Sequence, residues 1–361
     1  MSRYSFILSN YVKPLFMQTG ESSCNCSYID DNTLLSCWRN FTFIDFKYRQ
    51  RFRKIIGKHI WFNDTLWSDS KIFKVDEQNK LRALKYFTKT DNHSLRSSGC
   101  EDFRIIKWDN RTYALYSKII EPFSIYDEHF CEIDENYNII NDIILKTENK
   151  IEKNWQPIET MPFECVYSYK PFKTINLKSK EYTNYNNNVC ETNYRGSTQV
   201  VPYKDKNICI VHLRNETNLY HYYTHYFAIF DKDMNLIKIT RPFSFMGADI
   251  EFCTYMKNRA NTLEILMSVN DQLSFKYEIP ENIVDSIITE TLDNNIVSKR
   301  LYDDLFYNAK QNNNLLTAIC IATFSRNKET ISDAIMLNHN CSLSKTKREI
   351  LQRILLDIYK R

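Results

Sequence analysis

The chain has little glycine, five residues in 361, and none of its hydrophobic runs approaches the length of a membrane span. We therefore expect no membrane span, and we expect each glycine at a position where the backbone needs it. The chain also has no Gly-rich phosphate loop and no dinucleotide-binding fingerprint. Neither sign of charge dominates, because 48 Lys and Arg residues are interspersed with 44 Asp and Glu residues. That balance argues against a nucleic-acid binder.

Signals for export and for metal binding are missing as well. The apolar piece after Met1 is short and is interrupted by Asn10, so it does not resemble a signal peptide. The 11 cysteines are an odd number in a long chain, which favours reduced thiols in a cytoplasmic protein over a disulfide framework. Cys24 and Cys26 form a CxC pair, but no second pair or nearby His completes a zinc set, so we expect no metal site.

Aromatic residues are abundant, at 14% of the chain, and most of them are Tyr and Phe. Such residues favour strands over helices. Hydrophobic residues make up 43% and charged residues 25%, which is ordinary for a soluble globular protein. The composition therefore indicates a globular protein rich in β-structure.

Five stretches of the chain repeat one pattern: a polar opening, a short strand, a polar turn and an apolar returning strand. The clearest begins at Gly99, continues through the adjacent carboxylates Glu101 and Asp102, and turns at residues 109–111. The other four begin at Asn25, Lys153, Arg195 and Gly247. A pattern that recurs in this way predicts a repeat architecture.

The segments between these hairpins also predict β-structure. Residues 130–140 and 226–237 match each other, since both consist of a strand, an acidic turn with Asn and a second strand. Units of about 40–50 residues that contain two hairpins are typical of four-stranded propeller blades. We therefore predict an all-β protein, a five-bladed β-propeller over residues 1–279. Its five polar openings would surround one pocket at an end of the central channel.

From about Pro280 the apolar spacing changes to the helical period. It predicts helices over residues 281–292, 298–310, 314–324 and 345–359. Residues 280–361 are thus expected to form a small α-helical C-terminal region. The pattern leaves open whether this region binds a partner, joins two copies of the chain or supports the propeller.

The repeated motifs, in this order and at propeller spacing, resemble the five-bladed β-propellers of glycoside hydrolase family 130, which includes β-mannoside phosphorylases, hydrolases and related mannosyltransferases. The resemblance covers residues 20–278, and it is strongest to propellers found alongside glycosyltransferases in glycan-assembly proteins. The motifs are Gly-Cys-Glu-Asp-Phe-Arg (99–104), Lys-Asn-Trp-Gln-Pro (153–157), Arg-Gly-Ser-Thr-Gln-Val-Val-Pro-Tyr (195–203), Val-His (211–212), and Arg-Pro-Phe-Ser-Phe with Gly-Ala-Asp-Ile-Glu-Phe (241–252).

The resemblance implies a catalytic acid at Asp102, although Phe103 stands where the family motif has proline. A carboxylic acid with a raised pKa can protonate the poor alkoxide leaving group of a glycosidic bond. Hydrolysis would need a second carboxylate to activate water, for which Glu251 is the first candidate and Asp249 the next. Polar residues in the motifs are assigned to substrate binding: Asn25, Glu101, Asn154, Asp249 and Tyr203.

Phosphorolysis would need cations that hold inorganic phosphate as a co-substrate. The resemblance places Arg104, Lys153, Arg195 and His212 in that role, and Arg can bind phosphate in a fork. His212 on its apolar strand also suits a buried core histidine, and Arg195 also suits an ion pair between blades. No cofactor is implied.

The sequence therefore predicts a carbohydrate-active enzyme that cleaves or forms glycosidic bonds of β-linked mannosides or similar sugars, by phosphorolysis or glycosyl transfer. Its expected ligand is an oligosaccharide or a sugar phosphate. The alternative is a non-catalytic glycan-binding propeller that assists a glycosyltransferase, and a propeller that serves only as a protein-interaction platform stays open. A glycosyltransferase or a second copy of the chain is the protein partner considered.

Overall fold

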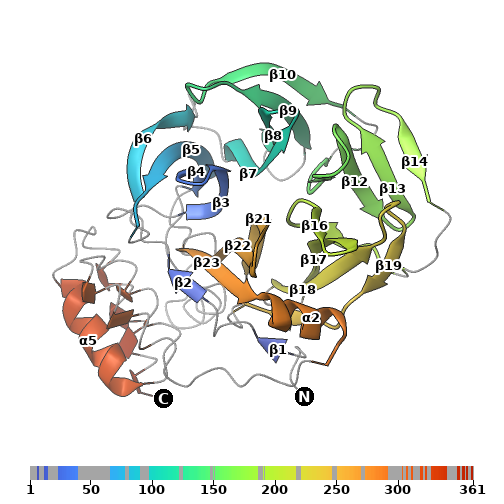
Figure 1. The fold of residues 1–361 in the computed structure, drawn as a ribbon. Helices are drawn as coiled ribbons and strands as arrows, with labels where there is room; N and C mark the ends of the chain where they lie inside the picture. The colour runs from blue at the N-terminus through green and yellow to red at the C-terminus, as the bar shows by residue number, and fades with distance from the viewer. Residues whose placement is uncertain are drawn as a thin grey trace.

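The computed structural model describes residues 6–7, 12–14, 23–39, 66–77, 81–89, 97–121, 125–146, 149, 151–185, 190, 192–216, 221–245, 250–269 and 273–291, then scattered positions from 303 to 360 that include 327–339. The chain is an all-β five-bladed β-propeller with a small helical C-terminal region, so the predicted fold class is confirmed (Figure 1). None of the described helices is long and apolar enough to cross a membrane.

The first three blades are four-stranded antiparallel units that follow one another along the chain, and a parallel pairing joins the first two into one eight-stranded sheet. Blade 1 consists of β3 (Ser23–Asp30), β4 (Thr33–Arg39), β5 (Leu66–Val75) and β6 (Leu81–Thr88). Blade 2 consists of β7 (Ser97–Trp108), β8 (Arg111–Glu121), β9 (Ile125–Ile133) and β10 (Ile139–Leu145). Blade 3 consists of β11 (Gln156–Pro157), β12 (Glu164–Tyr169), β13 (Phe172–Asn176) and β14 (Tyr182–Asn184).

The last two blades are less regular. In blade 4, two short strands, β15 (Arg195–Gly196) and β16 (Val201–Tyr203), both pair with β17 (Lys206–Glu216), and β18 (His221–Phe230) and β19 (Leu236–Ile239) follow. Next to blade 4, β1 (Phe6–Ile7) pairs in parallel with β20 (Phe243–Ser244). Blade 5 contains β21 (Glu251–Arg259), β22 (Thr262–Val269) and β23 (Leu273–Pro280).

The fourth strand of blade 5 comes from the start of the chain. This strand, β2 (Val12–Pro14), pairs antiparallel with β23, and Val12 stands opposite Tyr277. The sequence pattern does not identify β2, because three residues are too short to show a period of two. Its pairing closes the ring by joining segments from the two ends of the propeller.

The turns explain why the predicted hairpins form. Asp109 and Asn110 connect β7 to β8 with φ angles of 49° and 60°. Two successive positive φ angles are the signature of a type I′ turn, whose twist matches that of the flanking strands. Asp and Asn tolerate this left-handed region better than most residues, so the predicted polar turn at 109–111 is confirmed.

The outer hairpins of blades 2 and 4 share one turn structure. In each, an Asp carboxylate accepts bonds from the backbone amides two and four residues further on and from the side-chain amide of an Asn. In blade 2 these residues are Asp134 and Asn138, and in blade 4 they are Asp231 and Asn235. The predicted match between the two segments is therefore confirmed at the level of hydrogen bonds.

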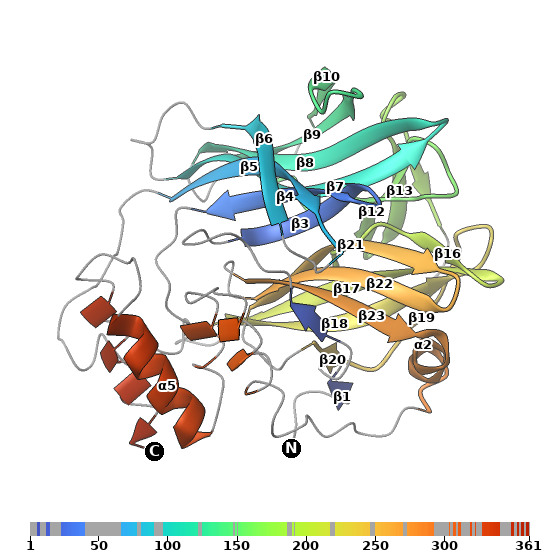
Figure 2. The same ribbon diagram turned by 60° about the vertical axis from the view of Figure 1, so that its left-hand side comes forward.

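The C-terminal region packs on the propeller. Helix α2 (Glu281–Ile288) buries Val284 and Ile287, and it ends before the predicted residue 292, with Glu290 at a left-handed φ of 59°. Helix α5 (Lys328–His339) was not predicted from the sequence, and it lies outside the ring of blades in both views (Figure 1, Figure 2). The other three predicted helices lie largely outside the described residues, although the positions described within them are helical.

One hydrophobic cluster joins this region to blades 3, 4 and 5. It contains Phe306, Ile331 and Leu355 from the C-terminal region together with Phe227 and Tyr277 from the propeller. Burying these side chains removes apolar surface from water on both parts at once. The contact shows that the helical region supports the outer side of the last blades.

Candidate functional site

Strand β7 carries a bulge near its middle, between Glu101 and Arg104. Asp102 and Phe103 together stand opposite a single residue of β8, between the pairs that Glu101 and Arg104 make. Asp102 has a φ of 60°, an uncommon conformation for a residue with a side chain. Adjacent strand residues normally point to opposite faces, and a bulge of this kind re-aims one of them.

Phe103, at the position where the resembled motif has proline, belongs to a hydrophobic cluster shared by blades 1 and 2. Its ring stacks on Tyr116 at 4.9 Å between centroids and meets Phe87 edge-on at 5.5 Å. The Phe103 side chain is buried, so these contacts are made inside the protein. A large apolar residue therefore holds this segment by packing.

The carboxylate of Asp102 faces blade 1. Asn25 Nδ2 donates a hydrogen bond of 2.5 Å to Asp102 Oδ1. Ser268 Oγ of blade 5 donates in turn to Asn25 Oδ1 at 3.3 Å. Asp102 is 6% exposed and Asn25 is 4% exposed, so this chain of bonds lies almost wholly inside the protein.

Arg104 is fully buried and joins blades 2, 3 and 4. Its Nε donates to the carbonyl of Ser197 at 2.7 Å and its Nη1 to the carbonyl of Asp102 at 3.0 Å. Its Nη2 donates at 3.4 Å to the carbonyl of Gly196 and to Asn154 Oδ1. The guanidinium thus donates to four oxygen acceptors, three of which are backbone carbonyls of buried residues.

Gly196 has to be glycine because blade 3 passes so close to it. A Cβ atom at this position would lie 2.2 Å from the carbonyl oxygen of Asn154 and 2.4 Å from Cγ of Gln156. The side chain of Gln156 also crosses to blade 4, where its Nε2 donates to the carbonyls of Thr198 and Ile210. Close backbone contact therefore fixes the openings of blades 3 and 4 against each other.

Lys153 opens blade 3 and pairs with blade 2. Its Nζ lies 2.5 Å from Glu101 Oε1 and 3.9 Å from the centroid of the Tyr126 ring. Burial alone would lower the pKa of Lys153, but Glu101 and Asp102 raise it above its usual value, so the ammonium stays charged. Both adjacent carboxylates of the bulge therefore act on the same cation.

His212 and Arg195 stand opposite each other on β17 and β15. Nδ1 of His212 lies 2.8 Å from Ser197 Oγ, and the buried ring stacks on Tyr223. Burial, with the nearby positive charges of Arg195 and Arg104, holds the pKa of His212 well below its usual value. The imidazole is therefore neutral at neutral pH, whereas the side chain of Arg195 is exposed.

Eight of the predicted site residues thus come together where the blades begin, and we call them the axial cluster: Asn25, Glu101, Asp102, Arg104, Lys153, Asn154, Arg195 and His212. Tyr203 lies elsewhere, because its hydroxyl anchors α2 through Asp285 Oδ1 at 2.9 Å and the carbonyl of Glu281 at 3.2 Å. Asp249 lies outside the described residues.

Glu251 is buried between blades 4 and 5. Its Oε2 accepts hydrogen bonds from Ser244 Oγ at 2.9 Å and from the amide of Phe245 at 2.8 Å. The same oxygen lies 3.8 Å from Nε2 of His225, whose pKa burial lowers to about 3. These contacts direct the Glu251 carboxylate into the interface between the two blades.

The sequence did not single out Glu128, a third carboxylate near the bulge. It lies on β9, in register with Ser117, which stands opposite Glu101 on its other side. Ser117 Oγ donates to Glu128 Oε2 at 2.9 Å, and Oε1 is buried without a partner among the described residues. Burial raises the pKa of Glu128 to about 8, although Arg104 and the Ser117 bond oppose the shift.

No protein-family model matches this sequence, and no curated protein matches it either. Several solved structures are similar in fold. A β-1,2-mannobiose phosphorylase from Listeria innocua covers 80% of this chain and 98% of its own, with 10% identity and a TM-score of 0.50. A glycosyl hydrolase from Bacteroides ovatus covers 77% and 91%, with 11% identity and a TM-score of 0.50. A Parabacteroides distasonis protein covers 77% and 92%, with 11% identity and a TM-score of 0.51. At such identities the likeness establishes a shared propeller fold.

Replacing Arg104 by Lys should destabilise the protein strongly. Lys keeps the charge but has no fork, so several buried carbonyls lose their donor, at a cost of about 3 kcal/mol or more. Thermal unfolding measures the effect. The control is Arg111→Lys, because the Arg111 side chain is 64% exposed. Equal melting temperatures for Arg104→Lys and the wild type would contradict a clamping role.

Replacing Glu128 by Gln should remove a pH-dependent loss of stability. Because the pKa of Glu128 is raised in the folded protein, the neutral side chain adds to the free energy of unfolding. This contribution is fully present below pH 4.5 and is lost as the pH rises towards 8. Gln cannot ionise, so the variant does not lose this contribution. Its free energy of unfolding relative to the wild type should therefore rise by on the order of 3 kcal/mol from pH 5 to pH 8.5. Chemical denaturation at both pH values measures this, with the exposed Glu135→Gln as the control. If the difference in free energy of unfolding between the variant and the wild type does not change with pH, Glu128 is not held neutral.

Proposed function

We propose that the chain is a carbohydrate-active enzyme that cleaves or forms glycosidic bonds of β-linked mannosides or similar sugars. One observation carries the proposal: Asp102 is held at a left-handed bulge, with its carboxylate bonded to Asn25 and its carbonyl to Arg104. Bulges re-aim a side chain and are over-represented next to active sites. The fold shared with a β-1,2-mannobiose phosphorylase supports the same substrate class.

In this proposal Asp102 is the general acid. Its proton passes to the glycosidic oxygen as the bond to the anomeric carbon breaks, which converts a poor alkoxide leaving group into an alcohol. Arg104 acts as a positioning residue, because it holds the carbonyl of the acid itself and ties it to Gly196 and Ser197 of blade 4. Lys153 and the exposed Arg195 are the cations left to meet an anionic co-substrate.

The enclosure of Glu251 favours phosphorolysis or transfer over hydrolysis. A hydrolase would need a carboxylate that activates water at the anomeric carbon. Glu251 is fully buried, and its Oε2 is bonded to Ser244 and Phe245. Inorganic phosphate or a sugar hydroxyl would then be the attacking group, and no resident cofactor takes part in this proposal.

The burial of the axial cluster favours a second candidate, a non-catalytic glycan-binding propeller that assists a glycosyltransferase. Glu101 is 2% exposed, Arg104 is 0% exposed and His212 is 2% exposed. A network so enclosed could serve mainly to join the blades. The two functions differ in whether bound sugar is turned over.

Replacing Asp102 by Asn should separate these functions. Asn accepts the left-handed backbone, but it cannot donate a carboxylic proton. Phosphorolysis of β-mannosides, or transfer of mannose from GDP-mannose, should therefore slow by about 100-fold or more. Sugar binding should stay within about threefold of the wild type. The matched control is Asp109→Asn, since Asp109 is an exposed left-handed Asp on the turn after the same strand.

The outcomes are distinct. Unchanged turnover in Asp102→Asn would remove Asp102 from the mechanism. A wild type that binds mannosides without turning them over, with phosphate, water or GDP-mannose present, would support the binding module. A wild type that binds no sugar would contradict both candidates.

A further inference from the structure

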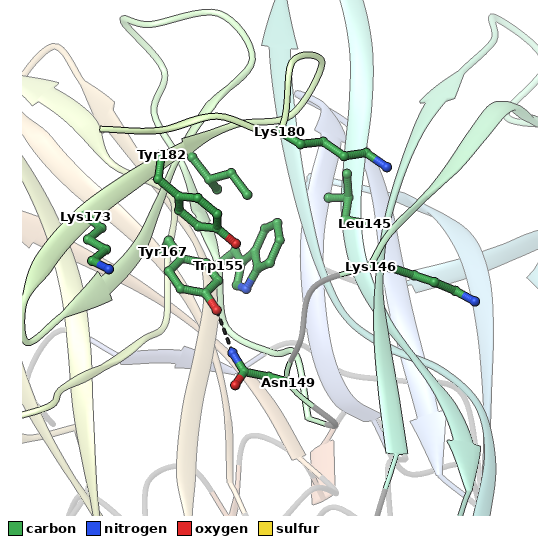
Figure 3. A pocket seen from close by; sticks show the side chains of 9 residues that line it. Leu145, Lys146, Asn149, Trp155, Tyr167, Lys173, Lys180 and Tyr182 are labelled. Atoms are coloured by element: carbon green, nitrogen blue, oxygen red, sulfur yellow. Dashed lines mark hydrogen bonds between the residues drawn. The ribbon is translucent and has the colours of Figure 1, made fainter. Parts of the chain in front are cut away.

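A cavity of about 550 Å³ lies between the outer end of blade 2 and the face of blade 3 (Figure 3). Its wall begins at Leu145, the last residue of β10, and continues over β12, β13 and β14. None of the residues that bond to Asp102 or Arg104 through their side chains lines it. The volume falls within the range of small-molecule sites, about 300–1,000 Å³.

The cavity is lined by positive charge without a compensating anion. Lys146, Lys173 and Lys180 belong to its wall, and no Asp or Glu is among the described residues that line it. None of the three ammonium groups has a carboxylate partner in the described part of the chain, whereas many other lysines do, such as Lys153. Unpaired lysines around a concavity attract an anion, because each is a point charge on a flexible stem.

Aromatic rings supply the other half of the wall. The ring of Tyr167 makes an edge-on contact with Trp155 at 5.2 Å between centroids and another with Tyr182 at 5.0 Å. Figure 3 shows these three rings together, with Lys173 on one side of them and Lys180 on the other. Tyr182 is 43% exposed, so part of its ring is open to a ligand. The negative face of such a ring attracts the weakly positive C–H groups of a sugar.

The aromatic wall is held in place from below. Asn149 Nδ2 donates to the hydroxyl of Tyr167 at 2.7 Å, and that hydroxyl donates to Glu152 Oε1 at 3.2 Å. Glu152 Oε2 also accepts from Nε1 of Trp155 at 3.0 Å. The carboxylate of Glu152 thus bonds to Tyr167 and Trp155 and fixes their rings, and the wall is preorganised for binding.

We propose that this cavity is a second carbohydrate site, which binds a saccharide carrying a carboxylate or a phosphate group. The lysines recognise the anionic group, and the exposed face of Tyr182 packs against the sugar ring. The preference for a saccharide over another anion that carries a ring rests on the proposed function. The site would let the protein hold a charged glycan on its flank while Asp102 acts on a different residue at the axis.

Calorimetric titration tests the proposal with four probes: a disaccharide of glucuronic acid and mannose, mannose 6-phosphate, neutral mannobiose and inorganic phosphate. At least one of the two charged sugars should bind about tenfold or more tightly than mannobiose and than inorganic phosphate. Which of them binds identifies the anionic group. Added salt should weaken the binding, because the lysines are near the surface.

Two variants place the binding in the cavity. Lys173→Gln combined with Lys180→Gln should weaken it by about tenfold or more, and Tyr182→Ala should weaken it by about fivefold. The matched controls are Lys107→Gln with Lys118→Gln, both exposed on blade 2, and Tyr86→Ala, whose ring is 47% exposed on β6. Melting temperatures show that each variant is folded.

The proposal is overturned if neither charged sugar binds, if the lysine pair variant binds as well as the wild type, or if inorganic phosphate binds as tightly as the sugars. Loss of binding in Asp102→Asn but not in the lysine variant would also overturn it, since the ligand would then lie at the axis. Because binding requires no turnover, the proposed activity and this site can fail independently of each other.

Discussion

The buried guanidinium of Arg104 is the interaction on which the axial end of the propeller depends. One side chain of blade 2 donates to the carbonyls of Asp102, Gly196 and Ser197 and to the side chain of Asn154. These acceptors belong to three blades, and the three residues that offer backbone carbonyls are buried. The openings of blades 3 and 4 are therefore held by a charge that blade 2 supplies, so these three openings are not independent of one another.

The same dependence continues around the ring through Asn25, which connects Asp102 to Ser268 of blade 5. The Asp102 carboxylate is therefore oriented by residues of blades 1 and 5 as well as by the backbone of β7. The chemistry expected of Asp102 is thus tied to the correct closure of the whole propeller. This coupling also accounts for Phe103, because packing against Tyr116 fixes the bulge that the neighbouring hydrogen bonds require.

The blades could be predicted from the sequence because their signals are local. The turn at Asp109 and Asn110 and the matching turns that begin at Asp134 and Asp231 depend on neighbouring residues alone. The closing strand β2 could not be predicted, because its pairing depends on a partner far along the chain. Glu128 also gave no signal: in the sequence it is one polar residue in a strand, and only the fold surrounds it with protein. Similarly, nothing in the residues around Tyr203 indicates that its hydroxyl bonds to α2 rather than pointing to the axis.

The closure of blade 5 has a consequence for biosynthesis. Val12 pairs with Tyr277, so the ribosome makes the first strand of this pair long before the second. Until then the ring is open, and the apolar faces of the first and last blades have no neighbour to cover them. Long-range pairing of this kind is slow to form and leaves such surfaces exposed to other chains. The nascent protein thus keeps uncovered apolar blade faces until late in translation, when nearly all of the propeller has been made.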